Sequence, residues 1–412
     1  MSHKPKCRFC ASELKTTFVN LGMQPLCQDH VKPEELNQME PHYPLHTYVC
    51  SKCFLVQLEE FVTPDKIFDD YAYFSSYSDS WLSHAKKYTD LMTEKLNLNK
   101  NSFVAEIASN DGYLLQYFLE KKIPILGIEP AENVAEYAIK EKNIPTEVKF
   151  FGVETAHYLK DKYPQPDLLL GNNVLAHVPN INDFVGGMKV LLKDSGVITM
   201  EFPHLQRLIE ENQFDTIYHE HFSYLSFSTV KRIFNHHGLE LFDVMELSTH
   251  GGSIRIFAKH VNNSDFPITE AVTELLNREN ELGFSEIEFY NTFEEKIKET
   301  KRKILDCLIK IKREGKSIAG YGAPGKGNTL LNYCGIRTDF LDYTVDRNPH
   351  KQNNYLPGTL VPILSPEKIK ETKPDYIFIL PWNLKNEIMD QMKFIRDWGG
   401  KFIIPIPEVH VV

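Results

Sequence analysis

The sequence predicts an α/β protein in which a small cysteine-containing domain is followed by two doubly wound α/β domains. Two C-x-x-C pairs occur near the start of the chain, and short apolar runs alternate with helical patterns in two later series. Strands that alternate with helices indicate parallel sheets. At roughly 100–200 residues per domain, 412 residues are enough for three domains. We expect them at 1–70, 71–262 and 263–412.

The composition is that of an ordinary globular protein, with 42% hydrophobic and 25% charged residues. The net charge of −10 argues against nucleic acid as a partner, because nucleic-acid-binding domains are usually basic. No apolar run approaches the ~18 residues of a membrane helix, and "MSHKPKC" lacks the apolar core of a signal peptide. We therefore expect a cytoplasmic protein without a membrane partner. A monomer is compatible with the sequence, but nothing in it specifies the oligomeric state.

The first domain carries the pairs "CRFC" and "CSKC". In a reducing compartment such pairs are more often metal ligands than disulfides. Cys7, Cys10, Cys50 and Cys53 can close a tetrahedral four-thiolate site with no open position, which predicts a structural Zn²⁺. The alternative is a redox C-x-x-C, but no redox-type βαβ pattern surrounds these pairs. The remaining cysteines, Cys27, Cys307 and Cys334, are interpreted as single buried thiols.

The first α/β series begins with a helical pattern at 82–96. Apolar runs at 103–108, 123–130, 147–151, 167–178 and 196–202 predict five parallel strands. A helix and two further strands, in "VKRIFNHHGLELFDVMEL" and "GGSIRIFAKH", should complete this sheet. Residues 268–314 are expected to be mostly helical. The second series then has a strand–turn–helix at 317–335 and strands at 341–346, 376–383 and 401–407.

The stretch "EIASNDGYLL" ends the first strand and opens a helix. Small residues there, Ala108, Ser109 and Gly112, let a ligand approach the backbone at the carboxyl ends of the strands. Glu129 ends the next strand, about 20 residues on, where a carboxylate can accept both hydroxyls of a ribose. Since ligands bind at this edge of such sheets, we expect a nucleoside there.

The ligand of this first site should be cationic and lack phosphate. G-x-G-x-x-G is absent, so there is little glycine to make room for a pyrophosphate, and Glu106 and the Asp111–Gly112 turn suit a cationic nucleoside. S-adenosylmethionine meets both conditions. Asn172, Asn173 and His177, in "GNNVLAHVPN", are expected to line the same cofactor site. The alternative is an ordinary α/β turn with incidental acidic residues.

The stretch "GYGAPGKGNTL" gives the second series a glycine-rich turn that opens a helix. Bare backbone amides and Lys326 suit a diphosphate, although the turn does not match G-x-x-x-x-G-K-[ST]. Asp346 could hold a sugar hydroxyl, and Ser253 and Arg255 of "THGGSIR" could reach an anion. The alternative is a tight turn without a ligand. The residues of the turn expected to bind substrate are Tyr321, Gly322, Ala323, Lys326, Gly327 and Asn328.

Taken together, the motifs resemble a known family. The paired cysteines, "YAYFSSYS", "EIASNDGYLL", "NNVLAHVPN", "EFPH", "YHEHFSY", "HGGSIR" and "GYGAPGKGNTLLN" occur in this order over nearly the whole chain. The sequence resembles the nucleotide-sugar (NDP-4-ketohexose) C-methyltransferases of deoxysugar biosynthesis. The resemblance implies a structural zinc domain, a middle domain that binds S-adenosylmethionine, and a Rossmann-like C-terminal domain that binds a nucleotide-linked 4-ketosugar. Methyl would be transferred to the carbon next to the ketone.

The resemblance also places functional residues in "YHEHFSY", at Tyr218, Glu220 and His221. A carbon next to a ketone becomes nucleophilic only after a base removes its proton, and histidine suits that task near neutral pH. We expect His221 to be the base, Glu220 its partner or the alternative base, and Tyr218 an orienting group or donor to the enolate oxygen. A further tyrosine that faces the sugar matches Tyr73 best, with Tyr77 and Tyr71 as alternatives.

The alternatives for "YHEH" are a metal site and a structural patch of satisfied hydrogen bonds. H-E-H is not the H-E-x-x-H arrangement of a helical metal site, and many buried histidines only make local hydrogen bonds. Adjacent side chains of a strand point in opposite directions, so the three residues can converge only in a loop, which we therefore predict. His219 is expected to matter least. His204 and His250 are interpreted as local hydrogen-bonding groups.

Two other functions are possible from the residues. A nucleotide-sugar epimerase or dehydrogenase that uses NAD has the same fold class, but the missing G-x-G-x-x-G argues against it. A non-catalytic zinc-containing binding protein is the second alternative. The "YHEH" cluster and the two predicted ligand sites argue against that alternative.

Overall fold

The computed structural model describes residues 4–63 and 74–412. Tyr71 and Tyr73 lie outside the described residues, and for Tyr77 only the backbone is described. The chain forms two compact units from interleaved segments. The first unit comprises residues 1–14, 50–204 and 222–285, and the second comprises residues 15–49, 205–221 and 286–412. The boundaries expected at residues 70 and 262 stay a prediction, since these units describe contacts rather than consecutive segments.

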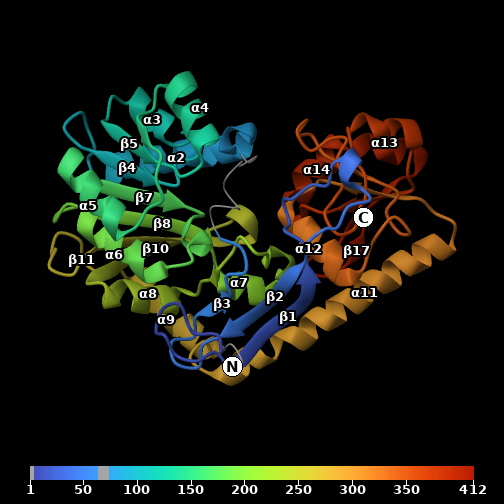
Figure 1. Ribbon diagram of the computed structural model, residues 1–412, viewed down its shortest axis with the longest axis horizontal. Helices are drawn as coiled ribbons and strands as arrows, with labels where there is room; N and C mark the ends of the chain where they lie inside the picture. Colours follow the sequence, from blue (N-terminus) through green and yellow to red (C-terminus); the bar gives the residue numbers. More distant parts are fainter. Residues whose placement is uncertain (1–3, 64–73) are drawn as a thin grey trace. The chain divides into compact units, whose positions relative to one another are not determined.

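The first unit contains a seven-stranded sheet in the order β10-β11-β8-β7-β4-β5-β6 (Figure 1). The predicted five-strand series is confirmed, because β6, β5, β4, β7 and β8 are all parallel. The two later strands complete the sheet, and β11 is antiparallel to both of its neighbours. The strands are β4 (Val104–Ile107), β5 (Ile125–Ile128), β6 (Thr146–Glu147), β7 (Leu168–Asn172), β8 (Val197–Pro203), β10 (Leu239–Leu247) and β11 (Ser253–His260).

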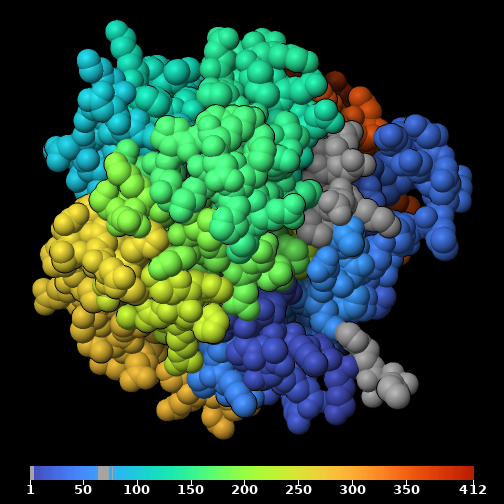
Figure 2. Space-filling view, turned by 60° about the vertical axis from the view of Figure 1, so that its left-hand side comes forward, coloured from blue at the N-terminus to red at the C-terminus, as the bar shows by residue number. Residues whose placement is uncertain are grey.

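Helices cover this sheet because their apolar stripes have to be buried against it. The buried residues of α2 (Asp79–Lys95) and α3 (Leu115–Glu120) share one core with β4, β7 and β8. Within that core the hydroxyl of Tyr88 is 2.5 Å from Oγ1 of Thr199. In Figure 2 the teal to green surface belongs to the segments from α4 to α6. The remaining helices are α4 (Glu132–Lys142), α5 (Val153–Lys162), α6 (Ile181–Leu191), α8 (Phe227–His236) and α9 (Glu270–Leu282).

The first unit also contains the paired cysteines and a short antiparallel pairing between β3 (Val56–Leu58) and β9 (Ser223–Tyr224). These strands are too short to form an independent core, which explains why the cysteine segment needs additional cross-links.

The second unit contains a mixed six-stranded sheet in the order β14-β13-β12-β15-β16-β17. All its neighbouring strands are parallel except β17, which is antiparallel to β16. The elements are β12 (Ile318–Tyr321), α12 (Gly325–Cys334), β13 (Thr344–Val345), β14 (Ile363–Leu364), α13 (Glu367–Thr372), β15 (Tyr376–Ile379), α14 (Lys385–Gln391), β16 (Lys401–Ile404) and β17 (His410–Val411). The strand–turn–helix predicted at 317–335 is therefore confirmed.

An N-terminal hairpin of β1 (Thr16–Gln24) and β2 (Tyr43–Val49) belongs to the second unit. It lies beside the long helix α11 (Phe293–Arg313) in Figure 1. The fully buried ring of Phe18 stacks on Phe293, with 4.7 Å between ring centroids, and meets Tyr290 edge-on. The unit also contains α7 (Leu205–Glu210) and α10 (Ile287–Asn291). The region 268–314 is mostly helical as expected, because it contains α9, α10 and α11.

Short 3-10 helices occupy several turns: Pro33–Glu35, Ser75–Tyr77, Leu175–His177, Phe214–Thr216, Thr249–Gly251, Trp382–Leu384 and Lys393–Trp398. Among the described residues, none of the helices combines the length and the apolar character that crossing a bilayer requires.

We predict that Phe18→Ala destabilises the second unit by about 3–5 kcal/mol, because the substitution leaves a cavity between the hairpin and α11. Met23→Ala is the matched control, since Met23 lies on the same strand with 59% of its surface exposed. Urea denaturation followed by circular dichroism measures both variants. Equal midpoints for Phe18→Ala and Met23→Ala would show that this contact does not hold the hairpin.

Candidate functional site

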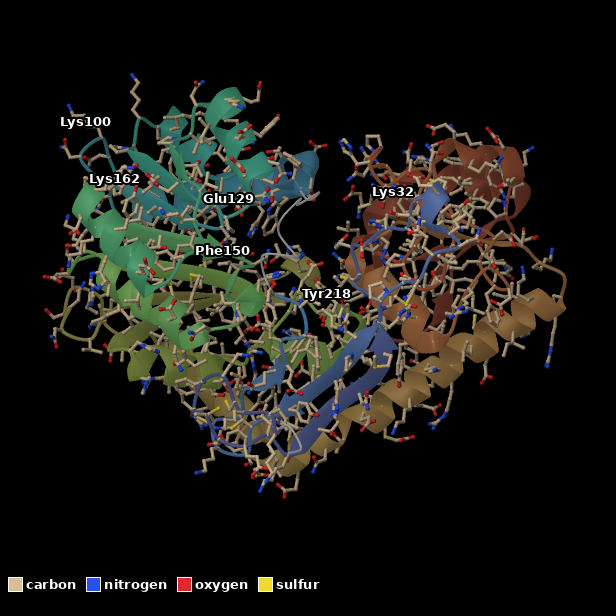
Figure 3. All side chains as sticks on the ribbon, in the orientation of Figure 1. Lys32, Lys100, Glu129, Phe150, Lys162 and Tyr218 are labelled. Atoms are coloured by element: carbon tan, nitrogen blue, oxygen red, sulfur yellow. The ribbon has the colours of Figure 1, made fainter. Side chains whose placement is uncertain are left out.

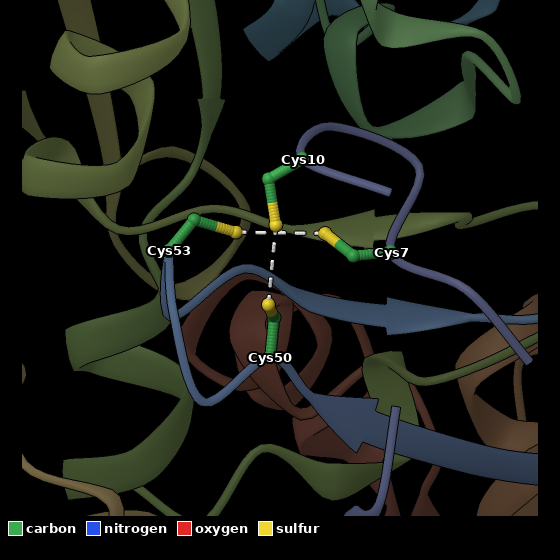
Figure 4. Close-up of side chains that lie close together, drawn as sticks. All are labelled: Cys7, Cys10, Cys50 and Cys53. Carbon is green, nitrogen blue, oxygen red and sulfur yellow. Dashed lines mark hydrogen bonds between the residues drawn. The ribbon is translucent and has the colours of Figure 1, made fainter. Parts of the chain in front are cut away.

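The four paired cysteines come together in the first unit (Figure 4). Sγ of Cys7 is 3.5 Å from Sγ of Cys53, the same distance separates Cys10 and Cys50, and all four sulfurs lie within 4.8 Å of one another. A tetrahedral site with Zn–S bonds of about 2.3 Å places its sulfurs about 3.8 Å apart. The donor set and its spacing therefore fit zinc.

The surroundings of the cysteines supply the donors that thiolates require. Nε2 of Gln57 donates to Sγ of Cys7 at 3.2 Å, and the backbone N–H of Lys52 points to Sγ of Cys50 at 3.5 Å. Side chains of α8 bind the same knuckle, because Thr229 and Arg232 both donate to the carbonyl of Cys53. A metal ion bound by the cysteines would therefore fix the cysteine segment to α8, one of the helices that cover the sheet.

The carboxyl end of β4 is the point at which the order of the parallel strands reverses, with β5 on one side and β7 on the other. Ligands of open α/β sheets bind at such a point. The loop after β4 has left-handed backbone at Ala108, Asn110 and Gly112. A Cβ on Gly112 would lie 2.2 Å from Cδ1 of Ile144, so the turn requires glycine there.

Buried acceptors gather at this loop. Both carboxyl oxygens of Glu106, the hydroxyl of Ser109 and Oδ1 of Asp111 are buried without a hydrogen-bond partner among the residues that the structure describes. Glu129 is buried beside them and is held by two backbone donors, the N–H groups of Asn110 and Ala131, each at 2.9 Å. Buried acceptors without donors are rare in native proteins, so this cluster indicates a ligand that donates hydrogen bonds.

The electrostatics of the cluster favour a cation. Burial raises the pKa of Glu106 well above its usual range, and the charges of Glu129 and Asp111 raise it further. Burial also raises the pKa of Glu129 to about 7. The nearest counter-charge is Lys142, whose Nζ is 3.7 Å from Oδ2 of Asp111. A positively charged ligand would lower the cost of ionising these carboxyls.

The other residues expected at the first site lie around the next strands. Nδ2 of Asn172, at the end of β7, is 3.5 Å from the hydroxyl of Tyr113. Nδ2 of Asn173 is 3.1 Å from Nε2 of His250, which therefore has the local role expected of it. His177 ends the turn Leu175–His177 and is half-buried. Contact of these residues with a ligand stays a prediction.

Ser253 and Arg255 lie on β11 of the first unit, while the glycine-rich turn belongs to the second. The buried guanidinium of Arg255 is bound to the buried carboxylate of Glu201, to which Nε2 of His84 also comes within 2.9 Å. Burial alone would raise the pKa of Glu201, but these two partners lower it to about 2. Ser253 donates to the carbonyl of Thr249. The charge of Arg255 is thus balanced internally, and its role in substrate binding stays a prediction.

His204 has a structural role of the same kind. It lies 2.7 Å from Oε1 of Glu279, whose carboxylate also accepts from the backbone N–H groups of Phe227 and Ser228 at the start of α8. This arrangement agrees with the interpretation of His204 as a local hydrogen-bonding group.

The "YHEH" segment belongs to the second unit and has no regular secondary structure from Ile217 to Phe222, which confirms the predicted loop. Figure 3 labels Tyr218, whose ring packs on that of His221 with 4.1 Å between centroids. His219 points elsewhere, with Nε2 3.3 Å from the carbonyl of Pro44. The loop therefore brings Tyr218 and His221 together and separates His219 from them.

The tautomer of His221 follows from its contact with the backbone. Nδ1 lies 2.9 Å from the carbonyl oxygen of Thr216, which can only accept, so Nδ1 carries the proton. In the neutral ring the lone pair is then on Nε2. His221 has the form that a general base requires.

Glu220 is buried in the second unit, and its Oε1 accepts from the thiol of Cys27 at 3.5 Å. Burial raises the pKa of Glu220 to about 7, although Cys27 and the charge of Lys351 oppose the rise. A carboxyl with a pKa near neutrality can accept and release a proton at physiological pH.

The glycine-rich turn leads from β12 into α12. Gly322 has φ +90°, and a Cβ there would lie 2.6 Å from Cδ of Pro381. Lys326, on the first turn of α12, donates to Oδ1 of Asn383 at 3.0 Å and lies over the ring of Trp382. Trp382 in turn donates to Oδ2 of the buried Asp215, while Oδ1 of Asp215 has no partner among the described residues.

The remaining residues expected at this turn have structural partners. Both carboxyl oxygens of Asp346 accept from backbone N–H groups, of Ala323 at 2.7 Å and of Asn348 at 2.8 Å. The hydroxyl of Tyr321 donates to Gln391. Gly327 packs against Leu380, where a Cβ would lie 2.9 Å from Cβ of Leu380. A sugar contact at Asp346 stays a prediction.

Several residues near the predicted site were not identified from the sequence as candidates. Cys27 and Lys351 flank Glu220, and Asp215, Trp382 and Asn383 surround Lys326. Two of them could have been suspected from the sequence, because Asp215 stands three residues before Tyr218 and Lys351 follows Asp346 in the same loop. Cys27 could be found only from the long-range contacts of the fold.

Comparisons with known proteins agree with this geometry. Residues 7–68 match a family described as "Putative zinc binding domain", residues 82–244 match "Methyltransferase domain", and residues 248–407 match "C-methyltransferase C-terminal domain". The chain is 34% identical over 407 residues to "C-methyltransferase NovU" of Streptomyces niveus, and the match covers 99% of this chain and 96% of that protein. The chain belongs to the C-methyltransferase family.

The enzyme is therefore an S-adenosylmethionine-dependent C-methyltransferase. The two alternative functions, an NAD-dependent epimerase or dehydrogenase and a non-catalytic zinc-containing binding protein, are wrong. Similar solved structures include the PH0226 protein of Pyrococcus horikoshii, 14% identical with a TM-score of 0.38, covering 49% of this chain and 99% of that one. The magnesium protoporphyrin IX methyltransferase of Synechocystis is 11% identical with a TM-score of 0.34, covering 47% and 90%.

We predict that the purified enzyme holds about one zinc ion per chain and that Cys10→Ser loses most of it, because one thiolate of a closed four-thiolate site is removed. Elemental analysis by mass spectrometry and a thermal melt measure the two consequences. Cys334→Ser is the control, since Cys334 is a buried thiol that is not part of the four-cysteine group. Full zinc content in Cys10→Ser would contradict the assignment.

Proposed function

We propose that the enzyme transfers the methyl group of S-adenosylmethionine to the carbon next to the ketone of a nucleotide-linked 4-keto-deoxysugar. The observation that carries the proposal is the packing of the "YHEH" loop on α12, the helix that follows the glycine-rich turn. Oγ1 of Thr329 on α12 donates to the carbonyl of Ile217, directly before Tyr218, at 3.0 Å. A proton-transfer loop and a diphosphate-type turn are thereby built into one unit.

The cofactor in this proposal is held by the acidic cluster of the first unit. Glu129 would accept the hydroxyls of the ribose, and Glu106 and Asp111 would face the positively charged end of the donor. The buried, unpartnered oxygens of Glu106 and Asp111 and the raised pKa values of Glu106 and Glu129 support this assignment. When bound, the cofactor supplies a methyl group on a sulfonium centre.

The acceptor in this proposal is held by the second unit. The first N–H groups of α12 and the ammonium of Lys326 would bind the diphosphate of the substrate. Burial lowers the pKa of Lys326, but the nearby charge of Asp215 opposes this, and an anionic ligand would act in the same direction as Asp215. The base of the nucleotide and the identity of the sugar are left open by this arrangement.

The chain's own residues would carry out the proton transfer. Nε2 of His221 would remove the proton from the carbon next to the ketone, which leaves that carbon as the nucleophile for the methyl group that the cofactor supplies. The hydroxyl of Tyr218, packed on His221, orients the base or donates to the enolate oxygen. Glu220 receives or shares the proton, as its pKa near 7 permits.

We predict that S-adenosylmethionine binds about tenfold more tightly at pH 7.5 than at pH 5.5. The ribose hydroxyls need an ionised acceptor, and burial raises the pKa of Glu129 to about 7, so the acceptor is mostly protonated at the lower pH. Isothermal titration calorimetry at both pH values measures the change. In Glu129→Gln affinity should be lower and should depend less on pH, with Glu106 as the remaining titrating carboxyl, whereas an unchanged pH dependence in that variant would refute the role of Glu129.

We predict that His221→Asn slows methyl transfer by about 10²–10⁴-fold, because the general base is removed. Mass detection of a product heavier by one methylene, across a panel of nucleotide-linked 4-ketosugars, measures the reaction. Exchange of the proton next to the ketone in deuterated water, with S-adenosylhomocysteine present, isolates the base step and should be lost as well.

The control for this experiment is His219→Asn, the same substitution two residues earlier in the loop, which should retain methyl transfer and exchange. A His221→Asn enzyme that binds substrate and keeps near-normal exchange would reject His221 as the base. If none of the 4-ketosugars is methylated by the natural enzyme, the proposed substrate class is wrong.

A further inference from the structure

Cys27 lies in the turn after β1, where this turn meets Glu220 of the "YHEH" loop and the start of α12 within the second unit. It is buried, with 4% of its surface exposed, and its thiol is 3.5 Å from Oε1 of Glu220. Nδ2 of Asn328 donates to the carbonyl of Cys27 at 2.6 Å. A Cβ on Gly325 would lie 2.8 Å from the sulfur. The start of α12 therefore fixes the thiol against the carboxyl of Glu220.

We propose that Cys27 is a positioning residue for the proton transfer, because its thiol donates a hydrogen bond that holds the Glu220 carboxyl in its ionised, proton-accepting form. The proposal rests on the function proposed above, in which Glu220 accepts or shares the proton next to His221. It assigns a role to a cysteine outside the paired cysteines and to the turn that carries it.

The direction of the hydrogen bond follows from the ionisation of the two groups. Burial raises the pKa of the Cys27 thiol well above its ordinary value, and the charge of Glu220 raises it further. The thiol therefore keeps its proton at neutral pH and donates. Glu220 is the acceptor, and a donor to its charged form opposes the effect of burial on its pKa.

Three other titratable residues lie near this pair: Lys351, Asp346 and His30. Lys351 lowers the pKa of Glu220 as well, but its Nζ also donates to the carbonyl of Ala323 at 2.8 Å and faces Asp346. His30 contributes no positive charge, because burial and then the charge of Lys351 lower its pKa to about 4. The thiol of Cys27 is thus the neutral hydrogen-bond donor to Glu220, and Lys351 is a cation that Glu220 shares with Asp346.

The expected effect of removing the thiol has a definite sign. Without the donor, the ionised form of Glu220 loses stabilisation and its pKa rises. Proton acceptance requires that ionised form, so the acidic limb of the pH–rate profile should move to higher pH. A purely structural role for Cys27 would instead lower the rate by the same factor at every pH.

The first experiment compares pH–rate profiles of kcat for methyl transfer in the full-length enzyme. Cys27→Ala should move the acidic limb up by roughly one unit and leave the rate above the limb within a few-fold of the natural enzyme. Cys27→Ser, which keeps a donor of similar size, should restore the limb. Cys334→Ala is the matched control, a buried thiol of the same unit that should leave the limb in place.

The second experiment follows the S–H stretching band of Cys27 by infrared spectroscopy without substrate, with Cys27→Ser to identify the band. The band should shift as Glu220 titrates, and Glu220→Gln should abolish that shift. A band that ignores pH, or an acidic limb that Cys27→Ala leaves unmoved, overturns the role of Cys27. Absence of methyl transfer to any 4-ketosugar overturns the proposed function instead, and the infrared band still decides whether Cys27 is paired with Glu220.

Discussion

The functional regions of this enzyme depend on one constraint: a carboxyl group taken out of water needs a partner, or its ionised form becomes costly. Three buried carboxyl groups of the chain differ in how far this need is met. Glu201 receives a full set of partners from Arg255 and His84 and becomes a structural ion pair. Glu220 receives a thiol donor and a shared lysine, and its pKa stays near neutrality. The carboxyl group of Glu106 has no hydrogen-bond partner within the described residues, and the proposed function assigns it to the cofactor.

The course of the chain explains how the second of these arrangements arises. Residues 205–221 leave the sheet of the first unit after β8 and join the second unit, and the hairpin of residues 15–49 joins it as well. The "YHEH" loop, the thiol of Cys27 and the glycine-rich turn therefore come from three distant parts of the sequence. In the proposed function, one unit thus holds the residues that bind and activate the acceptor, while the acidic cluster around Glu106 belongs to the other.

Much of this could be predicted from the sequence, because it depends on local patterns. Alternating strands and helices, the C-x-x-C spacing and the loop at "YHEH" all follow from periodicity or from residue chemistry, and the structure confirms them. The position of β11 between β8 and β10, the internal pairing of Arg255 and the contacts of Cys27 and Lys351 could not be predicted in this way. Each depends on residues far apart in sequence, for which one chain offers no local signal.

The stacking of Phe18 on Phe293 has a consequence for synthesis on the ribosome. The hairpin emerges first, but the helix that buries its apolar face emerges only after most of the chain has been made. At about 5–20 residues per second, the hairpin waits on the order of tens of seconds with that face unburied. The second unit therefore closes late, and the nascent hairpin exposes apolar surface until α11 has been made.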